Sequence, residues 1–119
     1  MTSLGLLFYD MTSKHKPEWD AEKFKTYLEE SGLSKKSAND CISRCRRVEK
    51  ILNINLVNET SNESSYISLM KKIRIYAENV ADNVEKRYAI TGTLRNSVRH
   101  FAGYRWTLRA KDYPKHYGL

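Results

Sequence analysis

The chain has 119 residues, of which 40% are hydrophobic, and it carries a formal net charge of +7 at pH 7. This length suits one domain with a single core and excludes two independent domains. No stretch approaches the roughly 20 apolar residues that a membrane span needs, so we expect a soluble, cytoplasmic protein without a membrane partner. The short apolar run at residues 4–9 lacks a basic leader and a cleavage site, and we do not read it as a signal peptide.

The positive charge is concentrated in two blocks of the sequence. Residues 35–58 hold six Lys and Arg against two Asp and Glu, and residues 86–119 hold eight against one. The two remaining regions, 1–34 and 59–85, are each about −2. A surplus gathered in this way must appear as positive potential on the surface, which an evenly solvated surface would not require.

The first half of the chain predicts an arm and two helices. Residues 1–16 should form an apolar N-terminal arm, and a first helix should run from Pro17 to Ser31, where Gly32 provides the stop. A second helix should follow an N-cap at Ser34. Its apolar residues recur at spacings of three and four, as one buried face demands: Ala38, Cys41, Ile42, Cys45, Val48 and Leu52. The opposite face is polar and mostly basic: Lys36, Asn39, Ser43, Arg46, Arg47 and Lys50.

The second half predicts a loop, two more helices and a tail. The polar segment from Asn53 to Ser65 reads as a loop. A third helix should begin at Ser64 or Ser65 and reach Val80, and the sequence as far as Tyr88 either continues it or restarts a helix. The last helix should run from a cap at Thr91 or Thr93 to about Ala110, and residues 111–119 should form a flexible basic tail. The buried edge of the last helix comprises Leu94, Val98, Phe101 and Ala102, and its polar side carries Asn96, Arg99 and His100, with Arg95 at the margin.

These elements predict an all-α protein, a compact bundle of four to five helices over residues 17–110. The sequence offers no catalytic or metal-binding motif. Cys41 and Cys45 lie four apart on the buried helix face, which predicts free thiols rather than a disulfide or metal ligands. No glycine-rich phosphate loop and no nucleophile signature is present, so we expect neither enzyme activity nor a cofactor.

Two stretches together form a pattern, FKTYLEESGLSKKSANDCISRCRR from Phe24 to Arg47 and TGTLRNSVRHFAGYRW from Thr91 to Trp106. An aromatic-rich helix precedes Gly-Leu-Ser, a helix with small residues inside and basic residues outside follows, and the last helix reads Leu-Arg-x-x-Val-Arg-x-Phe. Over residues 21–106 this order resembles the N-terminal core-binding (SAM-like) domain of tyrosine recombinases, the phage integrase family.

The resemblance implies a helical bundle that clamps one side of duplex DNA in a phage or mobile-element protein. It places two groups of residues near the duplex: Ser34, Lys35, Lys36, Ser37 and Asn39 from the second helix, and Arg95, Asn96 and Arg99 from the last. The catalytic domain of that family has no counterpart in these 119 residues, so the resemblance does not imply strand cleavage.

The residues themselves support two functional hypotheses. The first is a DNA-binding module, because Lys and Arg neutralise phosphates, Ser and Asn donate to phosphate oxygens, and helix N-termini at Ser34 and at Thr91 or Thr93 supply amides. Its expected contact residues are Ser34, Lys35, Lys36, Asn39, Ser43, Arg46, Arg47, Lys50, Arg95, Asn96, Arg99 and His100. The alternative is a protein-interaction module, such as a small phage inhibitor that docks on a host nucleic-acid-binding complex, with residues 1–12 as a docking or dimerisation element. The first hypothesis requires both basic blocks to converge on one continuous surface.

Overall fold

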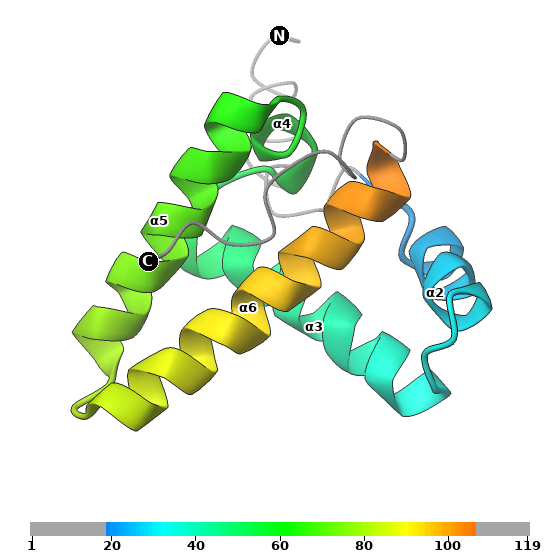
Figure 1. Cartoon of the computed structure of the whole chain (residues 1–119). Helices are drawn as coiled ribbons and strands as arrows, with labels where there is room; N and C mark the ends of the chain where they lie inside the picture. Colours follow the sequence, from blue (N-terminus) through cyan, green and yellow to red (C-terminus); the bar gives the residue numbers. More distant parts are fainter. Residues whose placement is uncertain (1–18, 107–119) are drawn as a thin grey trace, which may run out of the picture.

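The computed structural model describes residues 19–106, which form five helices and contain no strand (Figure 1). The helices are α2 (Ala21–Glu30), α3 (Lys35–Leu52), α4 (Leu56–Glu59), α5 (Glu63–Val80) and α6 (Val84–Arg105). The prediction of a small all-α bundle is therefore confirmed. The expected arm at 1–16, the tail at 111–119 and the expected last turn of the final helix at 107–110 lie outside the described residues.

The central helix of the bundle is α6. It forms a V with α5, crosses in front of α3, and meets α2 near its C-terminal end (Figure 1). The core that these helices enclose includes Phe24 and Leu28 of α2, Cys45 and Val48 of α3, Leu69 and Ile73 of α5, and Val98 and Phe101 of α6, all at 0% exposure. Burial of these side chains is the main stabilising contribution to the fold.

Local signals define both ends of α2 and the start of α3. The helix begins after Asp20, whose Oδ1 accepts hydrogen bonds from the backbone N–H groups of Glu22 and Lys23 at 2.9 and 3.3 Å. The predicted start at Pro17 is wrong, because Asp20 is extended and caps the helix instead. Gly32 has φ of +106°, so the predicted glycine stop is confirmed, and the predicted N-cap of the next helix at Ser34 is also confirmed.

The predicted loop between Asn53 and Ser65 contains a short helix, α4. Its N-cap is Asn55, whose side chain accepts from two backbone amides of the turn. Leu56 is fully buried, and its N–H donates to the Glu49 carboxylate at 3.0 Å. The sequence did not indicate α4, because the segment is mostly polar and one buried leucine makes no periodic pattern. The following helix, α5, begins at Glu63 after an Asn62 cap.

The last helix begins at Val84, well before the predicted cap at Thr91 or Thr93. Asn83 is the N-cap and accepts from the Lys86 N–H at 2.8 Å. Of the two alternatives for the segment after Val80, a restarted helix is therefore correct. Residues 84–93 contain no buried side chain, so the sequence has no apolar stripe there to indicate the helix.

Gly92 offers a direct test of helix propensity in this part of α6. A Cβ at this position would meet no atom within 4 Å, and the backbone is helical. Gly92→Ala should therefore raise the free energy of unfolding by up to about 1 kcal/mol, because alanine loses less backbone entropy than glycine in a helix. Urea unfolding followed by circular dichroism measures the change, and a destabilised variant would show that something contacts this position.

Candidate nucleic-acid interface

The exposed face of α3 carries most of the predicted contact residues. Capping by Ser34 and a run of apolar residues on the inner face fix this helix, so its polar residues must point outward. We call the outward row the α3 strip, and all of its members are exposed: Lys36, Asn39, Ser43, Arg46, Arg47 and Lys50. Ser34 and Lys35, at the start of the helix, are exposed as well. The predicted separation of a core face and a basic face is thus confirmed for α3.

Both carboxylates of α3 make contacts of their own, and with six basic residues the helix keeps a net charge of +4. Glu49 turns inward, where it accepts from the indole Nε1 of Trp19 at 3.2 Å and from the Leu56 N–H. Asp40 pairs with Lys36 across one helical turn at 3.2 Å, and the Lys36 side chain stays 87% exposed. Within residues 19–106, the other five basic side chains of α3 make no ion pair. They are Lys35, Arg44, Arg46, Arg47 and Lys50.

Two arginines at the margins of the α3 strip contact the neighbouring elements. The Arg46 guanidinium lies over the Trp19 ring, with its Cζ 5.8 Å from the ring centroid. On the other margin, Nη2 of Arg47 donates to the Tyr76 hydroxyl of α5 at 3.3 Å. Such contacts reduce the conformational freedom that an arginine loses when it binds a ligand. The aromatic anchors Trp19 and Tyr76 were not predicted, because they come from segments remote in the sequence.

Ser34 acts first as the cap of α3. Its Oγ accepts from the backbone N–H of Ser37 and donates to the Ser37 hydroxyl, both at 3.1 Å. The cap therefore uses one of the amides that would otherwise face an anion. The second predicted amide site, at Thr91 and Thr93, is wrong, because both residues lie inside α6, where the backbone N–H groups bond within the helix.

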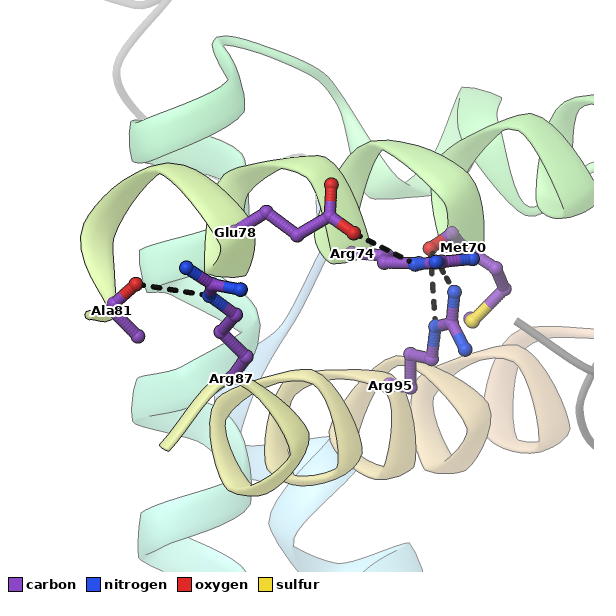
Figure 2. A network of polar contacts seen from close by, with 6 residues as sticks. All are labelled: Met70, Arg74, Glu78, Ala81, Arg87 and Arg95. Atoms are coloured by element: carbon purple, nitrogen blue, oxygen red, sulfur yellow. Dashed lines mark hydrogen bonds and ion pairs between the residues drawn. The ribbon is translucent and has the colours of Figure 1, made fainter. Parts of the chain in front are cut away.

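Arg95 is buried between α5 and α6, contrary to its predicted role in DNA contact. It is only 6% exposed, and its Nε and Nη2 donate to the backbone carbonyl of Met70 at 3.1 and 2.7 Å. Figure 2 shows this arginine extending from α6 to α5, close to the Arg74–Glu78 pair. A guanidinium in this position cannot reach a phosphate on the surface, so Arg95 is a structural residue that joins the two helices.

Removing the Arg95 guanidinium should therefore affect stability rather than DNA affinity. Arg95→Met keeps a long apolar stem but loses two charge-assisted hydrogen bonds, which should lower the free energy of unfolding by about 1–3 kcal/mol. Filter binding of the folded variant to duplex DNA should match the unmodified chain. A selective loss of DNA binding with unchanged stability would show instead that Arg95 contacts DNA.

The other predicted residues of α6 lie at its surface. Asn96 is exposed, and its Oδ1 accepts from Nη1 of the half-buried Arg99 at 3.0 Å. His100 is half-buried, and burial together with the neighbouring Arg99 charge lowers its pKa from the usual value. The lowered pKa favours the uncharged imidazole, which disfavours a contribution of His100 to phosphate binding.

The α3 strip and Arg99 point in opposite directions. Cys41 and Cys45 of α3 both donate through Sγ to the Ser97 carbonyl of α6, at 3.8 and 3.3 Å, which locates the α3–α6 contact. At about 100° per residue, Ser43 in the middle of the strip lies roughly 160° around α3 from both cysteines. Arg99 lies roughly 160° around α6 from Ser97. The two groups thus lie on the far sides of the crossing helices, with α6 in front of α3 in Figure 1. The continuous basic surface predicted from the sequence therefore does not include Arg99.

Two further features of the site concern α3 alone. Arg44 is exposed beside the strip, and its position on the helix wheel, at the edge of the polar face, is the signal by which the sequence identifies it. The cysteines are buried free thiols, as predicted. Burial raises the pKa of the Cys45 thiol well above its usual value, whereas a hydrogen bond with the Cys45 side chain lowers the pKa of the Cys41 thiol.

The comparisons with known proteins add no relatives: no protein-family model, curated protein or solved structure matches the chain. Among residues 19–106, no helix is long and apolar enough to cross a membrane. The same residues contain no group of three or more His, Cys, Asp or Glu side chains arranged to hold a metal ion.

Proposed function

We propose that this protein binds the phosphate backbone of duplex DNA through the exposed face of α3. The observation that carries the proposal is a set of five basic side chains on α3 that make no ion pair within residues 19–106: Arg46, Arg47 and Lys50 in the α3 strip, and Lys35 and Arg44 beside it. Lysine and arginine on one helix neutralise phosphates, and Asn39 and Ser43 of the strip donate to phosphate oxygens.

The dimensions of α3 limit the number of phosphates in contact. From Lys36 to Lys50 the helix rises about 21 Å, at 1.5 Å per residue. At about 3.4 Å of duplex axis per phosphate of one strand, this length spans about six phosphates. The five basic side chains without ion pairs within residues 19–106 can neutralise about three to five of them, fewer than two converging basic blocks would. The proposal keeps the α3 part of the interface implied by the recombinase resemblance, and it leaves out Arg95 and His100.

The dependence of affinity on salt tests the proposal. With three to five neutralised phosphates, the logarithm of the binding constant should fall with that of salt at a slope of about −2.7 to −4.5. Affinity should then drop roughly 40- to 500-fold between about 50 and 200 mM salt. Fluorescence anisotropy with labelled duplexes of several unrelated sequences measures this drop. Binding that ignores salt, or no binding at low salt, would contradict the proposal.

A further inference from the structure

The corner where α5 meets α6 exposes apolar side chains that the described residues leave uncovered. The large hydrophobic residues with the greatest exposure are all here, on the two helix ends joined by residues 81–83: Ile75 at 55%, Val80 at 54%, Val84 at 73% and Tyr88 at 82%. We call these four side chains the corner surface. Val84 and Tyr88 lie one turn apart on the same side of α6, and Gly92 continues that side by another turn. Single exposed hydrophobics are ordinary, but Val84 and Tyr88 exposed together on one side of a helix mark an interaction surface.

The helix that carries half of this surface is poorly supported by its own sequence. Residues 84–93 of α6 read VEKRYAITGT and include a glycine and several β-branched residues, which are weak helix formers. None of their side chains is fully buried, and only Ile90 is a hydrophobic residue that packs, partly buried, against the core. Because helices of this length are stabilised mainly by tertiary packing, a segment with so little burial fits a helix that packs against a partner.

The net charge of this corner indicates which kind of partner fits it. Residues 74–88 hold three basic and three acidic side chains, so the corner is neutral in a chain whose net charge is +7. Four of these charged side chains form two ion pairs, Arg74–Glu78 at 3.1 Å and Lys86–Asp82 at 3.7 Å. A nucleic acid or an acidic protein finds no attraction at this place. A second copy of the chain, which is repelled by most of the basic surface, meets no net charge here.

From these observations we propose that the corner surface is a self-association site, at which two copies of the chain pack α6 against α6 about a twofold axis. Val84 and Tyr88 of one copy contact the same residues of the other, as an isologous interface requires. Gly92, with open space around it, lets the two helices approach closely. This site is independent of the α3 strip, so the two proposals succeed or fail separately.

The size of the surface sets the expected affinity. With roughly 150–250 Å² for a tyrosine and on the order of 100 Å² for each aliphatic side chain, the four residues expose roughly 400 Å² of apolar area in each copy. A twofold contact of this size lies at the low end of specific interfaces. We therefore expect a weak dimer, with a dissociation constant on the order of 10–100 µM.

Sedimentation equilibrium of the full chain, free of nucleic acid, tests the proposal. Across about 5 to 500 µM protein, a reversible monomer–dimer equilibrium should appear. It should persist or tighten in about 1 M salt, because screening weakens repulsion between the two basic chains. Val84→Ser combined with Tyr88→Ser should raise the dissociation constant at least about tenfold, since both positions lose their apolar contact.

A matched variant separates this site from the DNA site. Arg46→Ser with Lys50→Ser also changes two exposed residues one turn apart, and it should weaken DNA binding while leaving the dimer intact. In the unmodified chain, concentration-dependent amide shifts should cluster at residues 84–92, which tests the site without any substitution. A chain that stays monomeric at every concentration, a dimer that survives the Val84 and Tyr88 changes, or shifts that cluster elsewhere would overturn the proposal.

Discussion

Reversing the charge of Arg47 and Lys50 together, as Arg47→Glu with Lys50→Glu, is expected to weaken duplex DNA binding at least about 100-fold at low salt. Both side chains are exposed on the α3 strip, without ion pairs in the part of the chain that the structure describes. Each loses a phosphate contact and gains a repulsion. The slope of the salt dependence should become shallower by about 2, because two fewer counterions are released. Anisotropy titrations at several salt concentrations measure both quantities.

The control for this experiment has the same net charge on a different surface. Lys71→Glu with Lys86→Glu changes two exposed lysines of α5 and α6 and, like the α3 variant, lowers the net charge from +7 to +3. If binding depends on the α3 strip, this control keeps most of its affinity and its salt slope. Equal losses in the two variants would mean that DNA responds to overall charge and not to α3. Circular dichroism of both variants verifies that the helices are intact.

The α3 face was predictable from sequence because all of its information lies within one helix. Eighteen residues with apolar spacings of three and four define the inner face, and the polar residues between them then define the outer one. The apolar period within α3 is therefore enough to predict which of its faces is buried. Even so, the sequence did not reveal that Trp19 and Tyr76 hold the two marginal arginines.

Predictions that depended on relations between helices failed. Arg95 falls at the edge of the polar face on a helix wheel, but α5 covers that edge and supplies the Met70 carbonyl. Likewise, the direction of Arg99 relative to the α3 strip depends on which face of α6 meets Cys41 and Cys45. Periodicity within a helix does not specify how two helices cross. The cap of the last helix was predicted at Thr91 or Thr93 instead of Asn83, because residues 84–93 contain no fully buried side chain and therefore no apolar period.

The core that fixes α2, α3 and α6 relative to one another should be most sensitive at Phe24. This side chain is fully buried, and its ring lies 5.7 Å from Trp19, 5.5 Å from Phe101 and 5.0 Å from Tyr104, measured between centroids. Phe24→Ala should lower the free energy of unfolding by about 3–5 kcal/mol, through lost burial and the cavity left behind. In a domain of this size the melting temperature should fall by roughly 15–30 °C.

Tyr88→Ala is the matched control for the Phe24 substitution. It also removes an aromatic ring, but from a position that is 82% exposed, so stability in dilute solution should change by no more than about 0.5 kcal/mol. Thermal and urea unfolding of the two variants at low protein concentration, where self-association is absent, gives the comparison. Because Trp19 contacts both Phe24 and Arg46, the cavity at Phe24 should also loosen one margin of the α3 strip. Similar melting temperatures for the two variants would contradict the placement of α2 against α6, and with it the anchoring of Arg46 by Trp19.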